Sequence, residues 1–221
     1  MTFFKTRVLK IDPSSPDADL DDIVSEASAL IGKDGIVSFP TDTVYGLGGC
    51  AFSERAVENI FKAKMRPPEK ALSVLIGSAG DMESVAADIP ESARILAEKF
   101  WPGALTIILR KKDVIPDSVT RGKDSVGLRV PAHPVALALL KKCGPLACPS
   151  ANISGNRAPQ TCDEVLEDLD GRIDLAIDGG KTPLGLSSTI IDLTGDVPVI
   201  LRKGSISAEQ IRSCIGDVRE L

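Results

Sequence analysis

The chain has few of the residues that carry nucleophilic and metal chemistry. Its 221 residues include one histidine, one tryptophan and one tyrosine. A metal site with several histidines is therefore excluded, and Ser-His or Cys-His catalysis would have to use the single histidine, His133. His133 stands directly before Pro134, and proline is favoured in the first turn of a helix. We therefore expect His133 to begin a helix rather than to act as a base.

Cysteine pairs and long apolar runs are also absent. The five cysteines contain no C-x-x-C pair and fit neither a disulfide framework nor a zinc ribbon. The longest uncharged stretch, residues 143–156, has 14 residues, whereas a membrane-spanning helix needs about 20 apolar ones. The first residues lack the apolar core of a signal peptide. These absences predict a cytoplasmic protein with reduced thiols and no membrane partner.

The charge balance limits the classes of binding partner. The chain has 26 Lys and Arg against 31 Asp and Glu, a net charge of −5, which argues against a generally basic surface for nucleic acid. Only 4% of the residues are aromatic, so a stacking platform for single-stranded RNA is poorly supported. A local basic site is compatible with both numbers.

Apolar residues alternate between helical and strand spacing along the whole chain. Strand patterns fall at 36–39, 72–77, 104–110, 125–130, 145–148, 173–177, 188–193 and 197–202, and helical patterns at 17–33, 53–66, 79–87, 90–100, 133–142, 161–169 and 207–215. Neighbouring strands near the C-terminus favour a mixed sheet over a purely parallel one. Since no repeat or Pro/Gly/Ser-rich linker divides the chain, we expect one α/β domain over residues 1–221, with a twisted mixed sheet and flanking helices.

A polar loop is expected directly after the strand at 36–39. Residues 40–49 combine two threonine hydroxyls, a carboxylate, the only tyrosine and several glycines. Such a loop is often only a turn. Its many polar groups at the end of an apolar strand nevertheless favour a binding loop.

Basic residues gather at the predicted end of the helix that begins near Ser53. Lysines in the last turn offset the helix dipole, which accounts for Lys62 and Lys64. Arg66 and Lys70 lie around the stiff Pro67-Pro68 bend, beyond the helix. A rigid bend that carries several cations suits a polyphosphate.

A third polar segment follows the strand at 145–148. Ser150 and Asn152 form an S-x-N pair before a glycine turn, which is either a capped loop or a ligand contact. Ser125 and Arg129 are four residues apart on one strand and so share a face. Ser188 begins another strand and Arg202 ends the last one.

Taken in order, these segments resemble the YrdC/TsaC family. The resemblance rests on P-T-D-T-V-Y-G-L at 40–47, K-x-R at 64–66, S-x-N at 150–152, W-P-G-A-L-T at 101–106, V-G-L-R-V-P at 126–131 and S-T at 188–189. It covers roughly residues 20–205 and implies a mixed α/β fold with a concave basic cavity. It also implies threonylcarbamoyl-AMP synthase activity, in which L-threonine, bicarbonate and ATP give threonylcarbamoyl-AMP and pyrophosphate.

The resemblance also implies roles for particular residues. Catalytic roles fall on Lys64, Arg66, Ser150 and Asn152; ATP binding on Arg66, Lys70, Ser125, Ser150 and Arg202; L-threonine binding on Thr43, Arg129 and Ser188; and Tyr45 would line the cavity. Four positions differ from the usual family residues: Ala71, Leu75, Cys148 and Ser187. On this basis Lys64 and Arg66 would both lie in a solvent-filled cavity, so that alanine at either position would abolish pyrophosphate release and spare the fold.

The implied reaction needs no protein nucleophile, in keeping with the single histidine. Mg²⁺ would arrive with ATP and keep several waters, without a dedicated cage of protein ligands. The product would pass to a separate threonylcarbamoyl transferase complex that modifies tRNA.

Two other functions stay open at this point. One is a YrdC-like paralogue that binds double-stranded RNA or tRNA and lacks synthase activity. The other is a carbamoyl-handling unit like that of hydrogenase maturation proteins, whose zinc-finger and acylphosphatase-like segments are not seen in this sequence.

Overall fold

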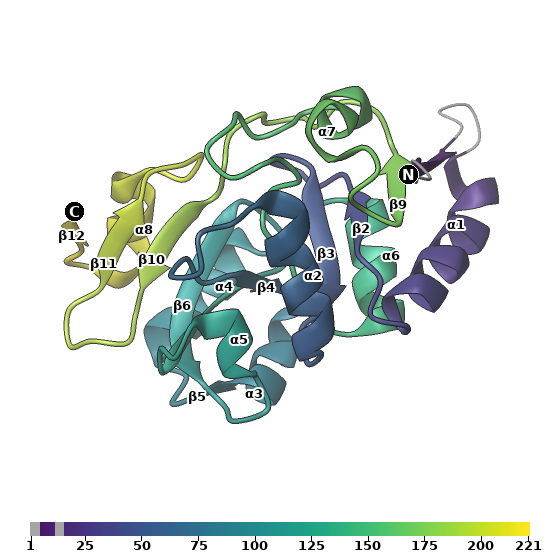
Figure 1. Ribbon diagram of the computed structural model, residues 1–221. Helices are drawn as coiled ribbons and strands as arrows, with labels where there is room; N and C mark the ends of the chain where they lie inside the picture. The colour runs from purple at the N-terminus through teal and green to yellow at the C-terminus, as the bar shows by residue number, and fades with distance from the viewer. Residues whose placement is uncertain (1–4, 12–15) are drawn as a thin grey trace.

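The computed structural model describes residues 5–11 and 16–221, with only the backbone described for 16–19. A twisted mixed sheet runs through the molecule in the order β1-β9-β2-β3-β8-β4-β7-β6-β10-β11-β12, with the short β5 beside β6 (Figure 1). Its strands are β1 Arg7–Lys10, β2 Val37–Phe39, β3 Gly46–Cys50, β4 Ser73–Leu75, β5 Ala86–Ala87, β6 Leu105–Lys111, β7 Ser125–Arg129, β8 Leu146–Ala147, β9 Leu175–Asp178, β10 Thr189–Asp192, β11 Val199–Arg202 and β12 Arg219–Glu220. The predicted mixed sheet is confirmed, since β10 pairs parallel with β6 and antiparallel with β11.

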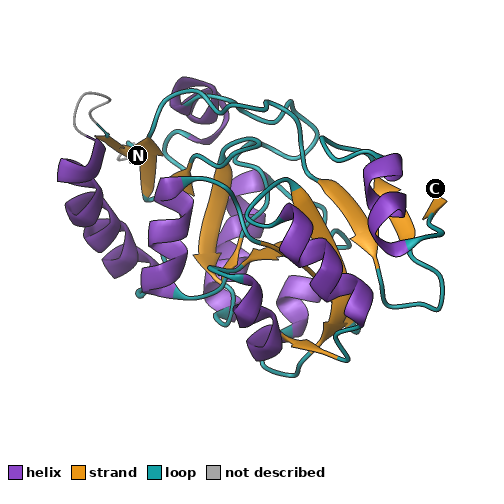
Figure 2. Cartoon of the chain, turned by 180° about the vertical axis from the view of Figure 1, so that it is seen from behind, coloured by secondary structure: helices purple, strands orange, loops and turns teal. Residues whose placement is uncertain are grey.

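Helices pack on both faces of this sheet (Figure 2). They are α1 Pro16–Ile31, α2 Glu54–Lys64, α3 Met82–Val85, α4 Glu91–Phe100, α5 Asp117–Thr120, α6 Pro134–Cys143, α7 Cys162–Leu169 and α8 Ala208–Ile215, with a 3₁₀ turn at Ala79–Asp81. His133 is the N-cap residue of α6, as expected. None of the described helices is long and apolar enough to cross a membrane.

Strand alternation divides the apolar side chains into two layers. On β9, Leu175 and Ile177 pack against α1 and α6, whereas Ala176 between them belongs to the larger layer on the other face. Side chains two apart on a strand share a face. Phe61 of α2 and Leu96 of α4 belong to the larger layer, so the sheet is covered on both sides.

The segment 40–49, expected as a loop, ends in a central strand instead. Residues 46–50 form β3 between β2 and β8. Glycine is depleted in strands, but a Cβ on Gly46 would lie 2.5 Å from Cys148 Sγ, and one on Gly48 would lie 2.6 Å from Phe39 Cε1. These two side chains approach the strand so closely that any larger residue would force them to move. The remaining residues, 40–45, form the polar turn that leads into β3.

The helix expected at 79–87 is a 3₁₀ turn followed by α3, and the expectation was wrong at its last two residues, which form β5. Ser78 and Asp81 form a capping box around the 3₁₀ turn, and the chain leaves α3 at Ala86 to pair with β6. Sheet pairing overrides the helical propensity of these alanines. The short elements β1, α5 and β12 were not anticipated.

The sequence has the capping-box pattern at two helix starts, Thr161-x-x-Glu164 and Ser207-x-x-Gln210, and the structure forms them differently. Ser207 and Gln210 form a complete box at the start of α8. Thr161 accepts a hydrogen bond from the backbone N–H of Glu164 at the start of α7, but the Glu164 carboxylate accepts from Gln160 N–H and not from Thr161. The second box is therefore shifted by one residue.

Candidate active site

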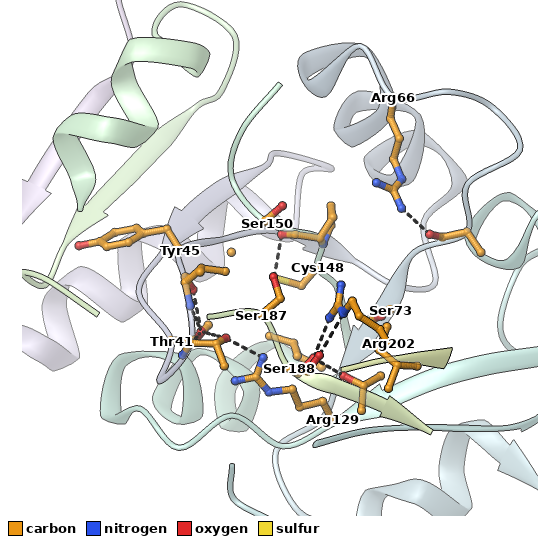
Figure 3. A pocket seen from close by; sticks show the side chains of 18 residues that line it. Thr41, Tyr45, Arg66, Ser73, Arg129, Cys148, Ser150, Ser187, Ser188 and Arg202 are labelled. Atoms are coloured by element: carbon orange, nitrogen blue, oxygen red, sulfur yellow. Dashed lines mark hydrogen bonds between the residues drawn. The ribbon is translucent and has the colours of Figure 1, made fainter. Parts of the chain in front are cut away.

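A cavity of about 220 Å³ opens where polar residues of β4, β6, β7 and β11 meet those of the loops before β3, after β8 and before β10 (Figure 3). Its wall consists of Thr41, Thr43, Val44, Tyr45, Gly46, Arg66, Ala71, Ser73, Leu75, Thr106, Arg129, Cys148, Pro149, Ser150, Ser187, Ser188, Ile190 and Arg202. Segments more than a hundred residues apart in the sequence thus meet at one site. All four positions that depart from the family pattern belong to this wall.

Arg129 is the most firmly held cation of the cavity. Only 7% of it is exposed. Its Nε donates to Gly103 O (2.9 Å), its Nη1 to Thr43 Oγ1 (2.8 Å) and its Nη2 to Asp42 Oδ1 (2.5 Å). A guanidinium has five N–H donors, so one N–H on each terminal nitrogen is left for a ligand.

The turn before β3 places these partners of Arg129. Thr41 Oγ1 donates to Val44 O (2.6 Å) and accepts from Thr43 N–H (3.1 Å), an example of a side chain that closes a turn through its own backbone. Asp42 is held in addition by Ala132 N–H (3.0 Å). The Asp42 carboxylate is therefore fixed before any ligand binds, and it fixes Arg129 in turn.

Arg202 and Ser188 form a second polar group, which lies beside Arg129 (Figure 3). Arg202 Nε donates to Ser188 O (3.0 Å), and its Nη2 donates to Ser188 Oγ (3.0 Å). Ser188 Oγ is also 2.8 Å from Thr106 Oγ1. The antiparallel pairing of β10 with β11 brings these residues together.

Arg66 stands at the edge of the cavity, beyond the end of α2. Ser53 Oγ caps that helix at Ala56 N–H, as expected, and Met65 ends it in the left-handed conformation. The bend that follows turns Arg66 back, so that its Nε donates to Lys70 O (3.0 Å) and its Nη2 to Ala71 O (2.7 Å). Figure 3 shows the Arg66 side chain approaching from the side away from Tyr45.

The cavity wall carries three arginines and, among the described residues that line it, no acid. Burial lowers the pKa of Arg66, Arg129 and Arg202. Repulsion from Arg129 lowers the pKa of Arg202 further, whereas Asp42 partly restores that of Arg129. Clustered guanidiniums with little counter-charge are suited to carboxylates and phosphates.

Lys64 does not lie in a solvent-filled cavity, and the expectation that it does was wrong. It is 1% exposed, and its Nζ donates to the backbone carbonyls of Ser150 and Asn152, at 2.5 Å each. Its own carbonyl accepts from Ser154 N–H (2.8 Å). Burial, and then repulsion from Arg66, lowers the pKa of Lys64 to about 8. Lys64 thus ties the end of α2 to the loop that presents Ser150.

Of the expected site residues, the structure brings Thr43, Tyr45, Arg66, Ser150, Arg129, Ser188 and Arg202 to the cavity wall. Lys64, Lys70, Ser125 and Asn152 are not among the described residues of that wall. Lys70 is exposed, and its carbonyl supports Arg66. Ser125 shares the strand face of Arg129 but lies at the far end of β7, paired with Arg110.

Asn152 and Tyr45 both support loops. Asn152 Nδ2 donates to the carbonyls of Ile153 (2.8 Å) and Asn156 (3.0 Å). The Tyr45 ring points away from the cavity arginines (Figure 3), and its hydroxyl donates to Gly180 O (2.7 Å). Burial raises the pKa of Tyr45 far above its usual value, so the phenol stays protonated as a donor.

The remaining titratable groups near the cavity are suited to neither nucleophilic nor metal chemistry. Burial raises the pKa of the Cys148 thiol to about 12, so it stays protonated near neutral pH. Within residues 5–11 and 16–221 there is no group of three or more His, Cys, Asp and Glu side chains that could hold a metal ion. What the cavity offers a ligand is positioned hydroxyls and guanidiniums.

Sequence reasoning missed the supporting residues of this site. Asp42, Ser73 and Thr106 were not among the predicted site residues. Asp42 lies in the P-T-D-T segment, beside Thr43, so its proximity to a predicted site residue was a usable signal. Thr106 ends the W-P-G-A-L-T motif, which was a usable signal as well. Nothing local in the sequence around Ser73 points to the cavity, because sheet pairing brings it there.

Fold and cavity together define a mixed α/β protein with a polar cavity lined by arginines. The profile of the Sua5/YciO/YrdC family, described as "Telomere recombination", matches residues 29–204. The chain belongs to this family.

Individual relatives agree with that assignment. Threonylcarbamoyl-AMP synthase of Pyrococcus abyssi is 47% identical over 87% of this chain, which matches 57% of its own length. Threonylcarbamoyl-AMP synthase of Bacillus subtilis is 43% identical over 97% of this chain and 62% of its own length. The crystal structure of P. abyssi Sua5 complexed with L-threonine superposes with a TM-score of 0.89 at 42% identity, over 100% of this chain and 63% of that one. The chain thus spans about three fifths of the length of these relatives.

Proposed function

We propose that the protein is a threonylcarbamoyl-AMP synthase, which joins L-threonine, bicarbonate and ATP. The observation that carries this proposal is the arginine-rich cavity in a chain that aligns along its whole length with a relative crystallised with L-threonine. Curated relatives named threonylcarbamoyl-AMP synthase support the same reaction.

L-Threonine would bind between Arg129, Thr43 and Ser188. The two N–H groups that Arg129 does not use within the protein suit the two oxygens of the amino acid carboxylate. Asp42 keeps the guanidinium in place and makes the charge of this corner close to neutral. The hydroxyl oxygens of Thr43 and Ser188, which Arg129 and Arg202 hold in place, would orient the amine and side chain of threonine.

ATP would bind along the rest of the wall, with Arg66, Ser150 and Arg202 near its phosphates. Lys64 would act on this end through Ser150, because it holds the Ser150 and Asn152 carbonyls. Lys70 and Ser125 were expected to contact ATP, but neither belongs to the cavity wall. They could contact only a part of ATP that extends beyond this cavity. We therefore place the nucleotide on Arg66, Ser150 and Arg202.

The chemistry follows from positioning and charge. The amine of threonine adds to bicarbonate with loss of water and gives an N-carboxylate. One oxygen of that carboxylate attacks the α-phosphorus of ATP; the bond to the bridging oxygen breaks and pyrophosphate leaves. Cations fixed before the reaction stabilise the negative charge that develops. No protein nucleophile takes part.

We propose that Mg²⁺ enters with ATP as part of the substrate. The described wall has hydroxyls but no free carboxylate, which suits an ion that is held by phosphates and keeps several waters. The ion would offset phosphate charge during the attack.

The product is a mixed anhydride and therefore reacts readily with water. It needs an acceptor nearby, and we propose a threonylcarbamoyl transferase complex that modifies tRNA. The five free thiols are in keeping with reaction in the cytoplasm.

Pyrophosphate release from Mg-ATP tests the proposal, with L-threonine and bicarbonate each left out in turn. We expect release only when both are present, and loss of release in Arg129→Ala. Release that does not depend on threonine would contradict the proposal. RNA affinity that falls steeply with salt and ignores ATP would then favour an RNA-binding paralogue.

A further inference from the structure

A second arginine lies beside Arg66, on an element that the cavity wall does not include. The guanidinium carbon of Arg121 is 3.6 Å from the centre of the Phe61 ring, and that of Arg66 is 6.0 Å from the same centre. Phe61 belongs to α2, whereas Arg121 follows α5, and these two helices pack against each other. The aromatic ring holds both cations close together.

Within residues 5–11 and 16–221, neither arginine has an acidic partner. Among the described residues, the ion pairs include neither Arg66 nor Arg121. Repulsion from Arg121 contributes to the lowered pKa of Arg66. Two like charges near each other disfavour the folded state unless an anion joins them. The Nε of Arg121 is buried as well and has no acceptor in the described part of the chain.

The backbone at Arg121 also suits a different residue better. Arg121 has φ 57°, in the left-handed region, and ends α5 there. Glycine or asparagine adopts this conformation with less strain. The backbone conformation at position 121 therefore gives no reason for an arginine there.

Arg66 connects this pair of arginines to the cavity. It lines the cavity, and two of its donors are fixed on the carbonyls of Lys70 and Ala71. Its other N–H groups remain for a ligand. Because the charge of Arg121 acts on Arg66, a polyanion bound at Arg66 would also be attracted by Arg121.

We infer that Arg121 is a further phosphate-binding residue, which together with Arg66 holds the terminal phosphates of ATP and the pyrophosphate that they become. This inference rests on the proposed function and adds to it the place of the leaving group. Adenosine is uncharged and gains little from two guanidiniums, whereas pyrophosphate carries several charges that both can share.

Binding of inorganic pyrophosphate, measured by titration calorimetry, tests this role without any turnover. We expect Arg121→Gly to bind it about 10-fold or more weakly, the effect of losing a charge-assisted contact. Arg121→Lys keeps the charge but not the flat contact with Phe61, and we expect an intermediate affinity. Arg55→Ala removes an exposed cation from the first turn of α2 and should leave the affinity unchanged.

Glycine is chosen at position 121 so that a loss of pyrophosphate affinity does not reflect a loss of folding. Because φ at Arg121 is positive, glycine should preserve the melting temperature, and Arg121→Asn offers a second variant that tolerates this backbone. Wild-type affinity in Arg121→Gly, or no pyrophosphate binding by the wild-type protein, would overturn the inference. Failure of the synthase proposal would appear separately, as pyrophosphate release without need of threonine.

Discussion

Replacement of Lys64 by alanine should destabilise the protein, whereas replacement of Arg66 should not. Lys64 is buried under the loop that carries Ser150, where its ammonium group is the donor to two backbone carbonyls. Arg66 lies at the edge of the cavity and its hydrogen bonds are closer to solvent. The two residues of one K-x-R motif thus have different surroundings.

The size of the effect at Lys64 follows from three contributions. Two buried carbonyls without a donor cost about 2 kcal/mol each, and three methylenes lost from the interior cost about 2 kcal/mol together. Burial of the lysine charge opposes this. The fall in the pKa of Lys64 from 10.5 to about 8 corresponds to about 3 kcal/mol at neutral pH, which alanine recovers. A net destabilisation of about 3 kcal/mol remains.

Thermal unfolding followed by circular dichroism measures the difference. For a domain of this size, about 3 kcal/mol lowers the melting temperature by about 10 °C. Arg66→Ala, the matched control from the same motif, should melt within about 3 °C of wild type and still lose pyrophosphate release. If Lys64→Ala melts like the wild-type protein, Lys64 does not hold the Ser150 loop.

Three further predictions concern titration and the threonine end of the cavity. The folded-state pKa of Lys64, about 8, lies below the unfolded value of 10.5, so the unfolded chain binds more protons between these pH values. The stability of the wild-type protein relative to Lys64→Met should therefore rise from pH 8 to pH 10.5 in urea titrations. A stability difference that does not change with pH would contradict the lowered pKa. Asp42→Asn should raise the KM for threonine about 10-fold with a smaller change in kcat, because Arg129 loses its charged partner; an unchanged KM in steady-state assays would refute this. Burial raises the pKa of Cys148 to about 12, so mass spectrometry should find it unmodified by iodoacetamide at pH 8 in the folded protein and alkylated in urea.

Local signals in the sequence predicted the helices better than the strands. Ser53 and Ser207 each cap a helix through a backbone N–H within the same turn, so the sequence around them was sufficient. The glycine-rich strand β3 was not predictable in this way. Only its close approach to Phe39 and Cys148 shows why Gly48 and Gly46 lie in a central strand.

The same distinction holds for the cavity. The resemblance to the family implied that Thr43, Arg129 and Ser188 would be close together, and the structure brings them to one wall. The direction in which a side chain points was harder to predict from the sequence. Lys64 lies on the buried face of α2 together with Ile60 and Phe61, so the lysine points inward, a result of tertiary packing that K-x-R alone does not contain. Arg121 was missed for a similar reason, since α5 and α2 meet only in the folded protein.

The most direct test of the proposed synthase is detection of its product. The purified protein would be incubated with Mg-ATP, L-threonine and ¹³C-bicarbonate, and adenylates would be separated and identified by mass spectrometry. We predict an adenylate with the mass of threonylcarbamoyl-AMP that carries the ¹³C label, formed only when threonine is present and absent with Arg129→Ala. An adenylate without the label, or none while ATP still binds, would contradict the account.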